Sequence, residues 1–156
     1  MTLEDLQHEL ALAVAAQLAA PSLRGRVIRA IALDVHPWHG HIGLCLLTDE
    51  DEEYPSLRVQ YEEMASWRLF NLAATPEWPR VAPLAEAMRA EYERAGDAKG
   101  KRLLLPAAAA ALDSPIVTDA LAPLTLAPSF ERFVGDPDDP EQTNLCAPER
   151  GGGLAS

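Results

Sequence analysis

The first 20 residues carry a strong helical pattern. Apolar side chains recur there at intervals of three or four residues, at Leu3, Leu6, Leu10, Val14 and Leu18. This spacing places them on one face of an amphipathic helix over residues 3–19. Thr2 precedes the first turn and Asp5 follows three residues later, so the two residues are predicted to form a capping box.

A second amphipathic helix is predicted over residues 80–95, and Gly96 is expected to end it. Its apolar positions are Val81, Leu84, Met88 and Tyr92. A short helix is expected over residues 103–112. Another is expected over residues 115–121, because Ser114 followed by proline is typical of an N-cap and a first helical position.

Between these helices, two runs rich in Val, Ile and Leu predict adjacent β-strands. The runs are residues 26–36 and 41–48, and Pro37–Gly40 between them predicts a four-residue turn. A hairpin with this turn fixes which residues of the two strands lie opposite each other. The expected partners are His36 with His41, Asp34 with Gly43, and Ala32 with Cys45.

The two faces of this predicted hairpin differ in side-chain size. One face carries large apolar residues, namely Ile31, Leu33, Val35, Ile42, Leu44 and Leu46. The other face carries the small residues Ala30, Ala32, Gly43 and Cys45. We expect both faces to be covered, with the alanine-rich N-terminal helix lying close against the small residues.

The remaining strand signals are shorter. Residues 57–61 alternate apolar and polar side chains, residues 130–134 suggest a last short strand, and residues 62–72 are compatible with helix or strand. The predicted fold class is therefore α+β, an antiparallel β meander of three to five strands packed against two main helices plus short C-terminal helices. Residues 1–134 form the predicted single domain. Residues 135–156 form an acidic, Pro- and Gly-rich irregular tail.

Composition limits the partners that the chain can bind. It has 24 acidic and 13 basic side chains and a formal net charge of −11, which disfavours binding to nucleic acid or to an anionic membrane. A basic partner is favoured, although a negative charge also keeps a protein soluble.

The N-terminus lacks the basic residues of a secretory signal, and no apolar run is long enough to span a membrane, so a cytoplasmic location is expected.

An acidic run follows the second predicted strand. Its residues are Asp49, Glu50, Asp51, Glu52 and Glu53. As a patch, they would attract a basic partner protein, and Trp38 at the hairpin tip would add an aromatic contact typical of interfaces. The alternatives are a solvated loop between two strands for the acidic run and a filler of the core edge for Trp38.

Three of the four histidines lie beside this tryptophan. His36, His39 and His41, together with Asp34, supply three imidazoles and a carboxylate, a donor set that suits a transition metal such as zinc. A bound ion would polarise a substrate or lower the pKa of a water molecule. The alternative is that these histidines are turn and surface residues without a ligand.

No motif identifies a reaction. The chain lacks a phosphate-binding glycine loop, a Gly-x-Ser-x-Gly elbow, a Cys-x-x-Cys pair and a His-Glu-x-x-His pair. This favours a non-enzymatic protein-interaction domain without a cofactor over an enzyme. A metal-binding domain or metal-dependent enzyme built on the histidines is the alternative, and either protein could form a homodimer.

One part of the sequence, residues 31–82, resembles a known group of proteins. The resemblance is carried by Ala32-Leu33-Asp34, Trp38-His39-Gly40, Leu46-Leu47-Thr48-Asp49-Glu50, Trp67-Arg68-Leu69-Phe70-Asn71 and Trp78-Pro79. These segments are similar to small uncharacterised bacterial proteins, some of which look like immunity proteins that neutralise a partner toxin. The resemblance implies a bacterial immunity or regulatory protein and brings no catalytic residues with it.

Overall fold

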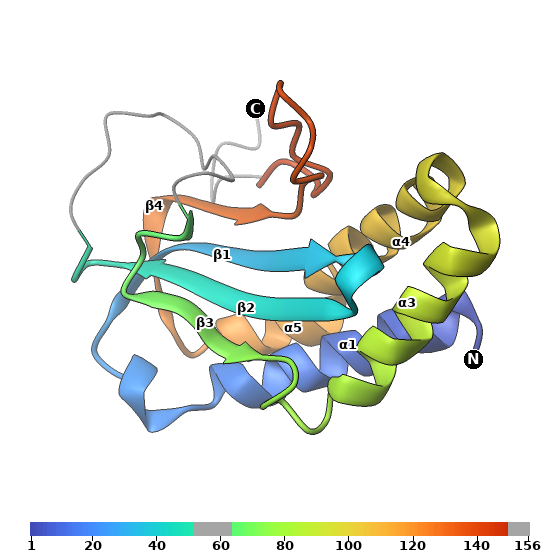
Figure 1. Ribbon diagram of the computed structural model, residues 1–156. Helices are drawn as coiled ribbons and strands as arrows, with labels where there is room; N and C mark the ends of the chain where they lie inside the picture. The colour runs from blue at the N-terminus through green and yellow to red at the C-terminus, as the bar shows by residue number, and fades with distance from the viewer. Residues whose placement is uncertain (52–63, 150–156) are drawn as a thin grey trace.

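A mixed β-sheet of four described strands forms the centre of the protein (Figure 1). The structure, a computed structural model, describes residues 1–51 and 64–149. The strands are β1 (Val27–His36), β2 (His41–Thr48), β3 (Leu69–Ala74) and β4 (Thr125–Phe133), in the order β3-β2-β1-β4. Helices and sheet together confirm the predicted α+β class.

The hairpin of β1 and β2 has the predicted register. His36 pairs with His41, Asp34 with Gly43, and Ala32 with Cys45. The turn is a short 3-10 helix, η2 (Pro37–His39), followed by Gly40 at a φ of 59°. Because a Cβ atom makes this left-handed conformation costly, a glycine here lets the chain reverse sharply.

The outer strands differ from the prediction. β4 begins at Thr125 and pairs parallel with β1, so the sheet is mixed and the antiparallel meander is wrong on this side. Three helices separate β3 from β4 along the chain, and a connection of that length permits a parallel strand. The predicted strand over residues 57–61 lies outside the described residues.

Helices cover the face of the sheet that carries the large apolar side chains. They are α1 (Leu3–Leu18), α3 (Ala82–Ala95), α4 (Asp97–Leu112) and α5 (Pro115–Leu121). Leu10 and Val14 of α1 bury against Leu33 and Leu44 in the main core. The predicted position of the N-terminal helix against the small residues is therefore wrong, because the face with the larger apolar area gains more from burial.

The starts of α1 and α4 can be compared with the starts predicted from the sequence. The capping box at the start of α1 is confirmed, since the side chains of Thr2 and Asp5 each accept a hydrogen bond from the other's backbone N–H. α4 begins at Asp97 and has 16 residues, as many as α1. It is therefore a third main helix rather than a short C-terminal one.

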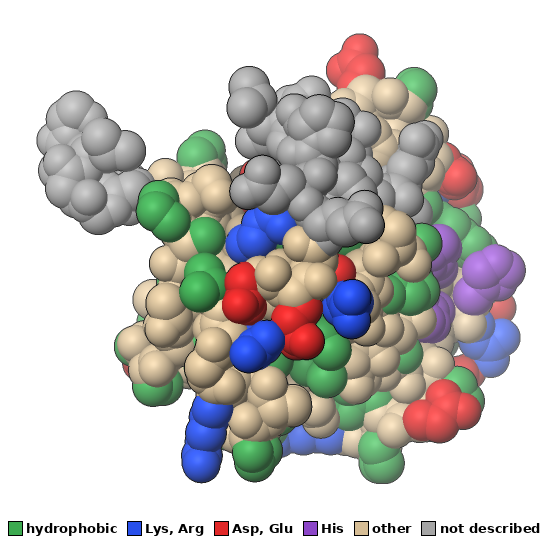
Figure 2. Space-filling model, turned by 90° about the vertical axis from the view of Figure 1, so that its left-hand side faces the viewer, with side chains coloured by type: hydrophobic (Ala, Val, Ile, Leu, Met, Phe, Trp, Pro, Cys, Tyr) green, Lys and Arg blue, Asp and Glu red, His purple; other side chains and the backbone are tan. Residues whose placement is uncertain are grey.

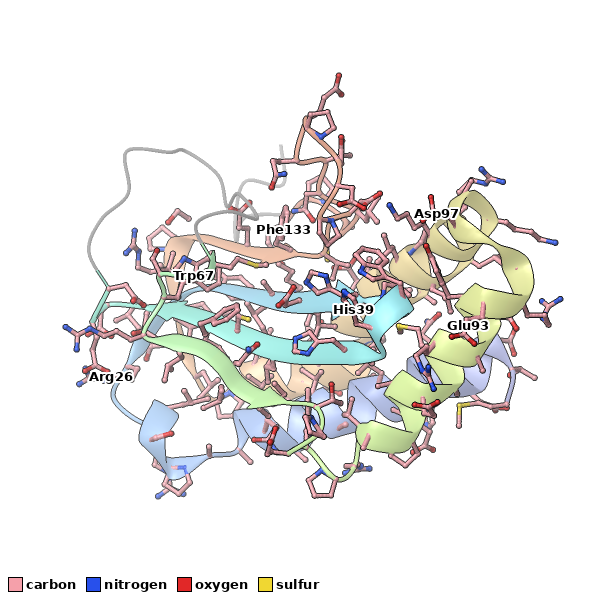
Figure 3. The ribbon with its side chains drawn as sticks, in the orientation of Figure 1. Arg26, His39, Trp67, Glu93, Asp97 and Phe133 are labelled. Carbon is pink, nitrogen blue, oxygen red and sulfur yellow. The ribbon has the colours of Figure 1, made fainter. Side chains whose placement is uncertain are left out.

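Aromatic side chains cover the opposite face of the sheet. This second cluster consists of Ala30, Ala32, Cys45, Leu47, Met64, Trp67 and Phe133. Trp67 and Phe133 are labelled in Figure 3. The small strand residues thus make room for an indole and a phenyl ring. Asp34 and Gly43 form the next pair of the hairpin toward its turn, just beyond this apolar cluster.

Residues 135–149 form neither helix nor strand, yet they are tied to the helices. Lys101 of α4 contacts Asp136 at 3.4 Å and Asp138 at 2.9 Å, and the hydrogen bond with Asp138 raises the pKa of Lys101. Cys146 is buried. The acidic run of the tail is therefore partly neutralised by a lysine.

One segment, Asp97–Leu121, is long and apolar enough to cross a membrane by length and composition alone. This is weak evidence, because core helices of soluble proteins have the same composition. Leu104, Leu105 and Leu112 of the segment are buried in the main core of the structure.

Candidate functional site

A cleft opens at the turn end of the hairpin. It has a volume of about 630 Å³ and is lined by Asp34, His36, His39, Gly40, His41, Asn71, Thr75, Pro76, Ala82 and Glu86. These residues come from the hairpin, from β3 with the loop after it, and from the start of α3. None of the described residues that line the cleft is a lysine or an arginine.

A buried carboxylate, that of Asp34, is part of the lining of this cleft. The residue is 5% exposed, and its Oδ1 atom is 2.8 Å from Nε2 of His36. Its Oδ2 atom is 3.4 Å from Nε2 of His41. Burial of a carboxylate is costly unless partners compensate it. Here Nε2 atoms of two imidazoles lie beside the carboxylate, and these contacts in turn orient both rings.

The strand geometry explains why these three side chains meet. Residues two apart on a strand share a face, so Asp34 and His36 point the same way. The register of the hairpin then places His41 directly opposite His36, with ring centroids 5.6 Å apart. This part of the predicted site is brought together as the sequence pattern indicates.

The fourth predicted ligand, His39, stands apart from this trio. It lies in η2 with an exposed side chain, and its ring centroid is 6.3 Å from that of His36. Within residues 1–51 and 64–149, no group of three or more His, Cys, Asp or Glu side chains is arranged to hold a metal ion. The imidazole N–H groups point at the Asp34 carboxylate instead of converging with it on one point.

Asn71 of β3 completes the cleft, and sequence reasoning did not identify it as a site residue. Its φ of 53° lies in the left-handed region, which asparagine tolerates better than most residues. The pairing of β2 with β3 shifts between Leu44 and Leu46, and such an irregularity can re-aim a side chain. The available sequence signal is a single asparagine in the otherwise apolar run Leu69–Ala74.

Gly43 makes room for the Asn71 amide. A Cβ atom at Gly43 would lie 2.2 Å from Oδ1 of Asn71 and 3.2 Å from Nε2 of His41. The first of these distances is far below any van der Waals contact, so a side chain at Gly43 and the present position of Asn71 exclude each other. The glycine is therefore part of the cleft's construction.

The cysteine near the cleft is not a nucleophile. The Cys45 sulfur lies 3.9 Å from Oδ1 of Asn71. Burial raises the pKa of the Cys45 thiol to about 12, so the thiol stays protonated at neutral pH. Because the thiolate is the reactive form, the arrangement favours binding over nucleophilic catalysis.

The acidic loop lies at the other end of the hairpin, and its described carboxylates have intramolecular partners. Asp49 accepts a hydrogen bond from the Val27 N–H at 3.0 Å, and Glu50 lies 3.3 Å from a guanidinium nitrogen of Arg26. Asp51 accepts hydrogen bonds from two backbone N–H groups. The remaining predicted members, Glu52 and Glu53, lie outside the described residues.

Figures 2 and 3 place this loop relative to the cleft. Arg26 and His39 are far apart in Figure 3, at opposite ends of the hairpin. Figure 2 views the Arg26 end and shows acidic and basic side chains side by side, with the histidines at the margin. Asp49 and Glu50 are thus compensated by Arg26, which reduces the attraction of these two carboxylates for a basic partner.

The predicted interface residue Trp38 is half-buried among its neighbours. Its ring centroid is 5.3 Å from that of His36 and 6.0 Å from that of Tyr92, and Lys101 Nζ lies 5.1 Å from the indole centroid. The indole therefore packs against the His36 ring, and Tyr92 and Lys101 pack against the indole in turn.

A second hollow adjoins the cleft. It has a volume of about 500 Å³ and shares His41, Asn71 and Thr75 with the first. Its other lining residues include Glu77 and Trp78. The two hollows together form a groove that passes along β3.

Comparison of the chain with protein-family models, with curated proteins and with solved structures yielded no match.

Proposed function

We propose that the protein is a non-enzymatic binding protein whose cleft receives a cationic side chain of a partner protein. The observation that carries this proposal is the buried Asp34 carboxylate in the lining of a cleft whose described residues include no lysine or arginine. A carboxylate can accept about four hydrogen bonds. A cationic group that enters the cleft can therefore add to the contacts that Asp34 already makes.

The charge of the whole chain supports the same partner. A net charge of −11 raises the rate at which a basic protein encounters the surface, and the cleft then supplies the specific contact. Glu77 in the adjoining hollow adds a carboxylate. Glu86 of the cleft is paired with Arg89. Asp34 is therefore the carboxylate of the cleft that we expect the cationic side chain to contact.

A bacterial immunity or regulatory role fits this chemistry. A partner that acts on nucleic acid carries lysine and arginine on its working surface. A protein that occupies those side chains would block that surface without any reaction of its own. Such blocking is the action that the resemblance of residues 31–82 to immunity proteins implies.

Binding of single-cation peptides tests the proposal. The probes are capped nine-residue peptides of serine and glycine with a central lysine, arginine or norleucine, titrated into the full chain by ¹H–¹⁵N NMR. We expect a basic peptide to shift the signals of His36, His41 and Asn71. The norleucine peptide, which lacks the charge, should bind at least about tenfold more weakly, equivalent to about 1.4 kcal/mol.

Two outcomes would refute capture in the cleft. One is equal binding of the norleucine and the basic peptides. The other is a pattern of shifts spread over the whole acidic surface, which would indicate general charge attraction that disappears at high salt. Recording the titration at two ionic strengths separates the specific site from this background.

A metal ion is the second candidate ligand, and one observation favours it. Ligand atoms that surround an ion at about 2.0–2.2 Å lie roughly 3 Å from one another. The two Nε2 atoms lie 2.8 and 3.4 Å from the Asp34 oxygens. An ion such as zinc could thus replace the imidazole protons with small side-chain rotations.

Elemental analysis of protein purified without chelator tests the metal. The expected result under this second candidate is about one transition-metal ion per chain, lost in the double substitution His36→Gln plus His41→Gln. A substitution of the exposed His8 by glutamine serves as the control. Metal content at trace level in the unsubstituted protein would rule this candidate out.

A further inference from the structure

We infer that the cleft selects an arginine side chain over a lysine side chain, and that Asn71 makes the selection. This inference rests on the proposed function and names its ligand more closely. It starts from the position of Asn71, which lines both hollows of the groove and therefore meets any segment that lies along it.

The amide of Asn71 lies close to the imidazole that contacts Asp34. Oδ1 of Asn71 and Nε2 of His41 are both within 3.2 Å of one point above Gly43. The same Nε2 atom is 3.4 Å from Oδ2 of Asp34. The Asp34 carboxylate and the Asn71 amide oxygen therefore both lie near Nε2 of His41, and one branched ligand is expected to reach both.

The backbone at Asn71 has a left-handed conformation, with a φ of 53°. Asparagine is among the residues that adopt this conformation most readily, so the position suits this side chain. Gly43 is also required in its present form, because a Cβ there would collide with the Asn71 amide. The left-handed backbone of Asn71 and the absence of a side chain at Gly43 thus place the same amide in the lining of both hollows.

Guanidinium geometry fits this pair of acceptors better than an ammonium does. A guanidinium is planar, carries five N–H donors in a fixed fork and is weakly hydrated, whereas an ammonium is a compact and strongly hydrated charge. One edge of the guanidinium can donate to Asp34 while another donates to Asn71. A lysine that reaches Asp34 has no fixed donor for the amide.

The arginine- and lysine-centred peptides test the selection on four proteins. These are the unsubstituted chain, Asn71→Gly, Gly43→Ala and, as a control, Gln7→Ala at a residue of α1 that lines neither hollow. Glycine at position 71 removes the amide and tolerates the left-handed backbone. We expect the arginine peptide to bind the unsubstituted and control proteins at least about fivefold more tightly than the lysine peptide.

In Asn71→Gly that ratio should fall to about one, through loss of arginine affinity with lysine affinity retained. Gly43→Ala should lower the ratio as well, since its methyl group displaces the amide. Equal binding of both peptides to the unsubstituted protein would overturn the selection while leaving the proposed function intact. A ratio unchanged in Asn71→Gly would overturn the role of Asn71, and failure of both peptides to bind would overturn the proposed function itself.

Discussion

Replacing Asp34 with asparagine is expected to weaken binding of the arginine-centred peptide by about 30-fold or more. Loss of one member of a buried, hydrogen-bonded charge pair costs about 2–5 kcal/mol, and the lower limit corresponds to that factor. Asp34 is the carboxylate that His36 and His41 of the cleft contact. Its neutralisation removes the electrostatic reason for a cation to enter.

The asparagine substitution is chosen because it changes charge and leaves shape. The side chain keeps its volume and keeps one carbonyl oxygen to accept from His36 or His41. We therefore expect the hairpin to stay folded, with circular dichroism and the NMR signals of the main core unchanged. Titration calorimetry or NMR with the arginine-centred peptide then measures affinity alone.

Asp119→Asn provides the matched control. Asp119 is exposed on α5, which lies behind the sheet in Figure 1, away from the cleft. Both substitutions remove one negative charge from the chain, so general attraction falls equally in the two variants. If Asp119→Asn weakened binding as much as Asp34→Asn, the net charge and not the cleft would be the cause.

The hairpin and its buried trio follow from the sequence by geometry alone. Strand alternation fixes the face of Asp34 and His36, and the turn at Pro37–Gly40 fixes the partner of His36. Both rules act over a few residues. No information from distant parts of the chain is needed, so this part of the site could be predicted.

The rest of the cleft depends on contacts between distant segments. Asn71 reaches Gly43 only because β3 pairs with β2 through an irregular register, and no local pattern sets that irregularity. The side chains that pack against Ala32 and Cys45 also come from distant segments. Small residues there predict a close neighbour, but they do not show whether it is a helix or the rings of Trp67 and Phe133.

The first half of β4 could not be predicted from the sequence, for a different reason. Its residues Thr125–Ser129 are mostly exposed and include Pro128, and a proline in a run argues against a strand interior. An edge position removes this objection, since an edge strand has one side without ladder partners. β4 is such an edge among the described strands. The order of strands in a sheet depends on distant parts of the chain, so local sequence patterns do not predict it.

Replacing Arg132 with methionine is expected to lower the free energy of unfolding by about 2–3 kcal/mol. Arg132 of β4 is 8% exposed and donates to Leu112 O at 2.9 Å and to Thr118 Oγ1 at 3.0 Å. It also donates to Glu149 Oε1 at 2.8 Å. One guanidinium thus joins the end of α4, the helix α5 and the C-terminal segment.

Methionine keeps the length and apolar stem of the arginine while removing its donors. The Leu112 carbonyl would then be buried without this partner, at a cost of about 1–3 kcal/mol. Breaking a fully buried ion pair costs about 3–5 kcal/mol, but the Glu149 side chain is 32% exposed and water can solvate its carboxylate. The expected loss of about 2–3 kcal/mol therefore lies at or below the lower limit of that range.

Urea denaturation measures this loss directly, since the free energy of unfolding falls linearly with urea concentration. Arg102→Met is the control, because Arg102 of α4 is exposed and should change stability by less than about 0.5 kcal/mol. Glu149→Gln should cost less than about 1 kcal/mol, since it leaves the two bonds of Arg132 to the helices intact. Equal stability of Arg132→Met and Arg102→Met would show that the guanidinium does not join these three segments, and that burial of the C-terminal segment rests on apolar contacts such as those of Cys146.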